Sequence, residues 1–106
     1  MSSVLIVDDH PDIRRLLSVT LGNDRHILEA DNAAAAMEAF KKYKPEVVLL
    51  DVMMPGSMDG LDVLDAIKGS AATRSTSVAM ISARGQAADS DEARRRGADA
   101  YFIKPF

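Results

Sequence analysis

Short runs of apolar residues recur along the chain and predict five strands. The runs are residues 3–7 (SVLIV), 26–30 (HILEA), 46–50 (EVVLL), 77–81 (SVAMI) and 100–103 (AYFI). Continuous apolar runs of this length that are rich in β-branched residues are typical of strands buried on both faces. The second run is more polar than the others, so we place it at an edge of the sheet.

The segments between these runs carry apolar residues at helical spacing. One predicted helix begins at Pro11, because proline suits the first turn of a helix. Asn32 can cap a second helix, and Asp59 precedes a third. Residues 86–97 form a fourth predicted helix whose apolar residues are all alanine, so it has little surface to bury and we expect it to be held loosely.

Strands that alternate with helices predict an α/β fold with a parallel sheet covered by helices. Right-handed crossovers favour a flavodoxin-like, doubly wound, five-stranded sheet of order 2-1-3-4-5. We expect one domain over residues 1–106. A final helix that would normally cover the last strand is absent from this chain, so an apolar face is expected to be exposed there.

Polar residues fall where the predicted strands end. Asp8 and Asp9 follow the first strand, Asp51 ends the third, Ser82 ends the fourth and Lys104 ends the fifth. Binding sites of open α/β sheets lie at the carboxyl ends of the strands, at the point where the strand order reverses. For the order 2-1-3-4-5 this point lies between strands one and three, which carry the three acids.

Three neighbouring carboxylates require a compensating charge. At a separation of about 4 Å and an effective dielectric constant near 20, each pair repels by roughly 4 kcal/mol. Oxygen ligands without cysteine favour Mg²⁺, Mn²⁺ or Ca²⁺. Lys104 and the Ser82 hydroxyl suit phosphoryl oxygens. These groups together predict phosphoryl transfer with an aspartate nucleophile.

Composition and the length of the apolar runs argue against several other classes of protein. The net charge of −3 argues against an electrostatic nucleic-acid binder, and the absence of cysteine excludes disulfides and thiolate metal sites. No apolar run approaches the length of a membrane helix, and the N-terminal run breaks on two acids, unlike a signal peptide. We therefore expect a cytoplasmic protein without membrane contact.

Five motifs resemble those of the receiver domain of two-component response regulators, and they occur in that family's order along the whole chain. They are VDD (7–9), LLDVMMP (49–55), MDG (58–60), ISA (81–83) and YFIKPF (101–106). The resemblance implies a signalling switch that catalyses only its own phosphorylation and dephosphorylation. It also implies a sensor histidine kinase or a histidine phosphotransfer protein as phosphodonor, and an output domain or downstream protein as target.

The resemblance assigns the acidic residues to phosphoryl transfer and to the metal. It implies that Asp51 is the phosphoacceptor and that Asp9 binds Mg²⁺ directly, with Mn²⁺ as the alternative ion. Asp8 would act mostly through water, and Met53 would supply a backbone carbonyl. His10, beside these acids, is interpreted as a solvated loop residue.

The resemblance gives the remaining residues roles after phosphorylation. Ser82 and Lys104 would bind phosphoryl oxygens, and the small Ala83 would leave the site open. Tyr101 matches the aromatic switch residue, although a purely structural role in the core is the alternative. Pro105 matches a position that follows a cis peptide bond in the family.

The chain departs from the family pattern in one loop and at its end. Gly56 and Ser57 stand where the family usually has one residue, and we expect the extra residue to bulge outward without disturbing the metal ligands. The final helix of the family commonly contributes to dimerisation, so the family's mode of dimerisation does not carry over to this chain.

Two other classes of function compete with the switch. A phosphatase or phosphotransferase with an aspartyl-phosphate intermediate usually has a second acid two residues after its nucleophile, where this chain has Met53. An interaction module that has lost phosphorylation is the other alternative. The presence of Asp9, Asp51 and Lys104 argues against it.

Overall fold

The computed structural model of this chain describes residues 3–22, 25–52, 58–82 and 87–103. Strands and helices alternate from the first element to the last. The strands are β1 (Ser3–Val7), β2 (His26–Ala30), β3 (Val47–Asp51), β4 (Ser77–Ser82) and β5 (Ala100–Ile103). The helices are α1 (Pro11–Leu21), α2 (Ala33–Tyr43), α3 (Gly60–Lys68) and α4 (Ala87–Arg95).

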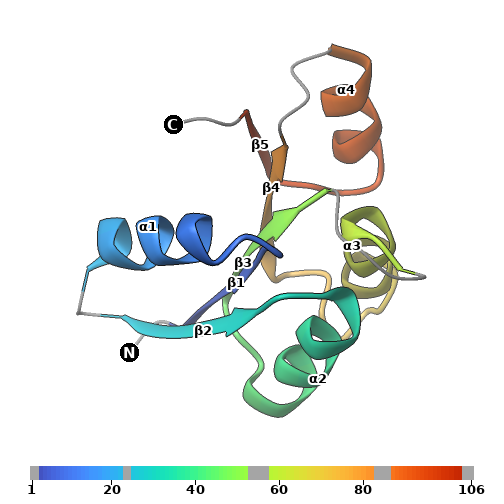
Figure 1. Ribbon diagram of the computed structural model, residues 1–106. Helices are drawn as coiled ribbons and strands as arrows, with labels where there is room; N and C mark the ends of the chain where they lie inside the picture. The colour runs from blue at the N-terminus through green and yellow to red at the C-terminus, as the bar shows by residue number, and fades with distance from the viewer. Residues whose placement is uncertain (1–2, 23–24, 53–57, 83–86, 104–106) are drawn as a thin grey trace.

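All five strands pair in parallel in the order β2-β1-β3-β4-β5, which confirms the predicted sheet. Figure 1 shows the sheet nearly edge-on, with α1 on one face and α2, α3 and α4 on the other. The chain leaves β1 toward β2 on one side and later enters β3 on the other side. The carboxyl ends of β1 and β3 therefore flank the point where the strand order reverses.

Local sequence explains where the helices begin. Pro11 occupies the first turn of α1, and the Asn32 side chain accepts a hydrogen bond from the Ala35 amide at the start of α2. At the start of α3, Asp59 and Asp62 form a reciprocal capping box. The N-cap residue of α1 is His10, and its side chain caps no amide.

The main core lies between the sheet and the α2–α4 face. It contains alternate residues of the central strands and the inward residues of the helices, all of them buried: Leu5, Val7, Val48, Leu50, Val78, Met80, Ala36, Phe40, Val63, Leu64, Ile67 and Ala93. Alternation places one side chain of each strand pair on this face. Burial of these apolar side chains is the dominant stabilising contribution to the fold.

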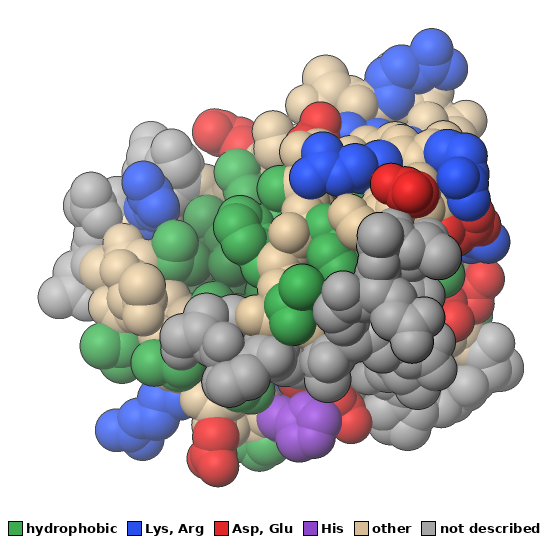
Figure 2. Space-filling view, turned by 90° about the horizontal axis from the view of Figure 1, so that it is seen from above, with side chains coloured by type: hydrophobic (Ala, Val, Ile, Leu, Met, Phe, Trp, Pro, Cys, Tyr) green, Lys and Arg blue, Asp and Glu red, His purple; other side chains and the backbone are tan. Residues whose placement is uncertain are grey.

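The opposite face of the sheet is covered less completely. None of the residues of α1 is buried, and Leu16, Phe102 and Ile103 are 44%, 53% and 49% exposed. A hollow of about 260 Å³ on this face is lined by Leu17, Leu49, Ile81, Phe102 and Ile103. Figure 2 shows hydrophobic side chains gathered at the surface, as the sequence predicted for this end of the sheet.

The boundaries of three predicted elements need correction. Strand β4 extends one residue beyond its predicted end, to Ser82. The third strand is shifted by one residue, to Val47–Asp51, because Asp51 itself pairs with Ile81 of β4. Helix α4 is shorter than the predicted 86–97 and is followed by Gly97, whose φ of +105° is incompatible with continued helix. Among the described residues, no helix has the length and apolar character needed to cross a membrane.

Candidate metal centre

Two buried aspartates meet at the carboxyl ends of the central strands. Asp8 and Asp51 are only 1% and 3% exposed. The amide of Asp8 donates to the Ala30 carbonyl at 3.1 Å, which continues the pairing of β1 with β2. Asp51 ends β3 and pairs with Ile81 of β4, so both carboxyl groups are placed by sheet hydrogen bonding rather than by a loop.

The carboxyl groups form one cluster with a histidine. Asp8, Asp9, His10 and Asp51 each offer a ligand atom, and these four atoms all lie within 4.8 Å of one another. The structure therefore brings together the three acids that the sequence predicted at this edge. His10, interpreted as a solvated loop residue, is 65% exposed, but its ring lies against the two preceding acids.

The donor atoms of this cluster fit a divalent cation. Oxygen atoms of carboxylates are the ligands that Mg²⁺ and Mn²⁺ prefer. Asp9 Oδ1 is buried and accepts no hydrogen bond among the residues that the structure describes, although His10 Nδ1 lies 3.1 Å from it. A buried carboxylate oxygen without a donor is destabilising unless a positive charge compensates it, so this atom is suited to bind a cation.

Gly60 allows the third helix to approach Asp51, a requirement that the sequence interpretation did not identify. Its amide donates to the Val52 carbonyl at 3.0 Å. A Cβ atom at position 60 would collide with the Asp51 carbonyl oxygen and would lie 2.8 Å from the carbonyl carbon of Asp51. The glycine of the MDG motif therefore sets the distance between α3 and the end of β3.

Arg14 supports the turn that carries the two N-terminal acids, and it too was missed. Its Nη1 donates to the Asp8 carbonyl at 2.7 Å, and its Nε donates to Glu29 of β2 at 3.1 Å. The side chain is 18% exposed. An arginine within the first two turns of a helix that follows an acidic strand end is the only signal for this contact in the sequence.

Ser82 and Tyr101 lie where the sequence placed them. Ser82 is fully buried at the last position of β4, one residue beyond the partner of Asp51 in the register. Tyr101 is half-buried in β5, pairs with Met80 and packs against the main core. Its rotation as a switch residue stays a prediction. Met53, Gly56, Ser57, Ala83, Lys104 and Pro105 lie outside the described residues.

Charged residues of α4 pair with one another and with α3. Glu92 accepts hydrogen bonds from Arg95 at 2.8 Å and from Arg96 at 2.9 Å, and Arg96 also contacts Asp65 of α3. Hydrogen bonds from Arg95 and Arg96 lower the pKa of Glu92, and Glu92 and Asp65 raise the pKa of Arg96. These four residues thus form a network of paired charges at the end of α4, and Figure 2 shows basic and acidic side chains gathered over this part of the surface.

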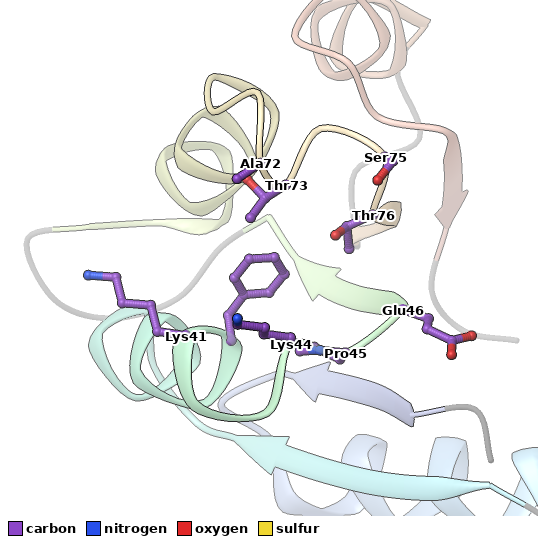
Figure 3. Close-up of a pocket in the computed structure, with 9 residues that line it drawn as sticks. Lys41, Lys44, Pro45, Glu46, Ala72, Thr73, Ser75 and Thr76 are labelled. Atoms are coloured by element: carbon purple, nitrogen blue, oxygen red, sulfur yellow. The ribbon is translucent and has the colours of Figure 1, made fainter.

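A cavity of about 490 Å³ lies at the opposite end of the sheet, away from the acid cluster. Figure 3 shows Lys41, Lys44 and Glu46 around it, with Thr73 and Thr76 on the facing loop. Asp8, Asp9, Asp51, Ser82 and Tyr101, the described residues of the predicted phosphoryl and metal site, do not line this cavity. This cavity is therefore separate from the place where the acidic residues converge.

The order of strands, the acid pair after β1 and the aspartate at the end of β3 define a receiver-type fold. Residues 4–106 match the family model described as the response regulator receiver domain. The chain belongs to this family, whose members act in two-component signalling.

Curated relatives and solved structures agree with this assignment. The chain is 36% identical over its full length to the transcriptional regulatory protein KdpE of Mycobacterium tuberculosis and spans 46% of that protein. It is 36% identical to the chemotaxis protein CheY of Halobacterium salinarum, with 97% of this chain and 84% of CheY covered. The chain therefore spans less than half the length of KdpE but most of the length of CheY.

Among solved structures, the chain is similar to the signal receiver domain of a DNA-binding response regulator from Colwellia psychrerythraea. The two share 30% identity with a TM-score of 0.94, and the match covers all of this chain and 88% of the other. This likeness agrees with the predicted flavodoxin-like sheet.

Proposed function

We propose that residues 1–106 form a phosphoacceptor switch in which Asp51 receives a phosphoryl group from a phosphohistidine. The observation that carries the proposal is the position of Asp51, which is 3% exposed at the end of β3 and lies in one cluster with Asp8 and Asp9. A sensor histidine kinase or a histidine phosphotransfer protein is the proposed donor.

In the transfer step, an Asp51 carboxylate oxygen attacks the phosphorus atom and the P–N bond to the donor imidazole breaks. The leaving nitrogen keeps the bonding electron pair. A divalent cation held by Asp8, Asp9 and Asp51, Mg²⁺ or Mn²⁺, would supply positive charge to the phosphoryl oxygens. Sheet hydrogen bonding on both sides of β3 keeps the carboxylate in place during the attack.

Phosphorylation of Asp51 is expected to change the conformation of the surface near α4 and β5. The phosphoryl group adds negative charge and three acceptor oxygens beside Ser82. We propose that Ser82 and Lys104 bind these oxygens and that Tyr101 turns inward. The differential contact energy would shift the population of two surface conformations, which an output domain or a downstream protein could recognise.

The test is to incubate the folded chain with Mg²⁺ and acetyl phosphate and to measure the intact mass. We expect one phosphoryl adduct in the wild type and none in Asp51→Asn, because the amide is not a nucleophile of comparable strength. Absence of the adduct in the folded wild type would contradict the switch. Multiple turnover on small phosphoesters would support a phosphatase instead.

The metal assignment has a separate test. Asp9→Ala is expected to weaken Mg²⁺ binding by at least about tenfold in calorimetry, because a charged oxygen ligand is lost. Asp12→Ala is a suitable control, since Asp12 lies three residues after Asp9, in the first turn of α1, but outside the cluster. Unchanged Mg²⁺ affinity in Asp9→Ala refutes the ligand role of Asp9.

A further inference from the structure

The imidazole of His10 contacts both acids of the turn that precedes α1. Its Nδ1 lies 3.1 Å from Asp8 Oδ1 and 3.1 Å from Asp9 Oδ1. The His10 amide also donates to Asp8 Oδ1 at 2.8 Å, which holds the backbone of the turn. Although His10 is the N-cap residue of α1, its side chain accepts no hydrogen bond from the first turn, so the ring is not engaged by the helix.

We propose that His10 Nδ1 is an additional ligand of the metal site and gives it a preference for late first-row divalent ions such as Co²⁺, Ni²⁺ and Zn²⁺. The inference rests on the metal site of the proposed function and deepens it. It concerns which ion the site selects, whereas phosphoryl transfer itself requires only that a divalent ion is bound.

The distances match those between neighbouring ligands of one ion. Ligands at adjacent positions of an octahedral ion with bonds of about 2.1 Å are about 3.0 Å apart, and opposite ligands are about 4.2 Å apart. The two 3.1 Å separations from Nδ1 correspond to two such edges. The four donor atoms lie within 4.8 Å of one another, so a small inward movement brings all of them to bonding distance.

The donor set explains the expected selectivity. Neutral imidazole suits Zn²⁺, Ni²⁺ and other late first-row ions, whereas Mg²⁺ binds oxygen atoms and retains several waters. A site made of aspartates alone would also bind late ions more tightly than Mg²⁺, but only because late ions bind most ligands more tightly. A nitrogen ligand adds binding free energy for the late ions that it does not add for Mg²⁺. The change in affinity on removal of His10 measures this contribution.

Ligation through Nδ1 is compatible with the surroundings of the ring. The ring proton then resides on Nε2, and since the His10 side chain is 65% exposed, water can accept a hydrogen bond from it. The other interpretation is that His10 only pairs with Asp8 and Asp9 by charge and hydrogen bonding. In that case a bound metal displaces the ring, and removal of His10 leaves the affinity unchanged or increases it.

Calorimetric titration of the whole chain with Mg²⁺ and with Co²⁺ distinguishes these interpretations. We expect His10→Ala to raise the Kd for Co²⁺ by about tenfold or more and to change the Kd for Mg²⁺ by less than about twofold. His26→Ala is the matched control, because His26 is exposed on β2 and packs against Tyr43 rather than the acids. Neither Kd should change in this variant.

A second measurement uses the wild type and is independent of any effect of the substitution on folding. The imidazole ¹⁵N resonances are followed during titration with Zn²⁺, and Nδ1 of His10 should shift while the nitrogens of His26 do not. An unshifted Nδ1 overturns the ligand assignment.

The outcomes separate this inference from the proposed function. Mg²⁺ binding by the wild type together with Co²⁺ affinity that does not depend on His10 overturns the inference and leaves the switch intact. Equal losses for both ions in His10→Ala also overturn it, because they indicate a structural effect. A wild type that binds neither Mg²⁺ nor Co²⁺ overturns the inference and the proposed metal site together.

Discussion

At the carboxyl end of the sheet, Asp8, Asp9 and Asp51 lie close together with a histidine, whereas at the amino end Asp99 is held by groups that compensate its charge. Asp99 Oδ2 accepts hydrogen bonds from the Val78 amide at 2.8 Å and from Lys68 Nζ at 3.0 Å. Lys68 also donates to the carbonyls of Arg74 and Thr76 and thereby fixes the loop beside the cavity of Figure 3.

The difference separates a carboxylate that serves the fold from carboxylates that we propose hold a metal ion. The acid at the amino end has its own amide and ammonium donors, so it stabilises the native state without an external ion. The three acids at the carboxyl end repel one another, and a bound cation would offset this repulsion. Opposite effects on stability are therefore expected when acids at the two ends are neutralised.

The largest effect is expected for Gly60→Ala at the acidic end. The added Cβ meets the backbone of Asp51 and Val52, which cannot move without breaking the sheet. We expect a loss of about 3 kcal/mol in the free energy of unfolding, measured by urea denaturation. Gly97→Ala at the amino end is the counterpart, since its Cβ would lie 3.0 Å from the flexible Lys68 side chain, although its φ of +105° adds strain. An equal or smaller loss for Gly60 than for Gly97 would contradict the role of Gly60.

The next effect concerns the lysine that compensates Asp99. Lys68→Met keeps the apolar part of the side chain. It removes the ammonium group that donates hydrogen bonds to two carbonyls and one carboxylate. We expect the free energy of unfolding to fall by about 2 kcal/mol, because these acceptors lose a charged hydrogen-bond donor. Lys41→Met on the exposed side of α2 serves as control and should change stability by less than about 0.5 kcal/mol.

Neutralising one acid at each end of the sheet tests directly whether the two ends differ in their effect on stability. Without divalent ions, Asp9→Asn should raise the free energy of unfolding by about 1 kcal/mol, because mutual repulsion in the cluster falls. Asp99→Asn should lower it by about 1 kcal/mol, a value discounted for the 52% exposure of the Asp99 side chain. Changes of the same sign in both variants, measured by thermal unfolding in EDTA, would contradict the distinction.

The smallest effect is the pH dependence at the amino end. Burial would raise the pKa of Asp99, but the Val78 amide and Lys68 outweigh it, so the pKa lies below its ordinary value. A carboxyl with a lowered folded pKa contributes stability above its unfolded pKa, and this contribution is lost as pH falls through the folded pKa. The difference between wild type and Asp99→Asn should thus be full at pH 7 and shrink below about pH 4. Urea midpoints at pH 7 and pH 3 measure it, and an undiminished difference at pH 3 would be evidence against this pairing.

Much of the fold follows from local pattern. Apolar runs predicted all five strands, and the helices begin at Pro11, after Asn32 and after Asp59, as expected. These features depend on neighbours in sequence, through backbone preference and capping, so they are readable without tertiary structure. The one-residue shift of the third strand is of a different kind, because pairing of Asp51 with Ile81 is a contact between distant residues.

The candidate site could be predicted only as far as topology dictates it. Parallel strands bring their carboxyl ends to one edge, so the convergence of Asp8, Asp9 and Asp51 followed from strand order. Strand order did not predict the contact of Arg14 with the Asp8 carbonyl or the distance of α3 from Asp51. Both depend on the angle at which a helix packs against the sheet. The orientation of the His10 ring between two carboxylates belongs to the same group.

The sequence by itself determined the order of elements, the class of fold and the residues that can act chemically at the edge of the sheet. Only the tertiary structure decided which groups lie next to each acid. Asp99 meets Lys68 across 31 residues, whereas Asp8, Asp9 and Asp51 meet one another and an imidazole. The physical reason is that electrostatic interactions depend on distance and burial, which packing sets and which residue types alone do not specify.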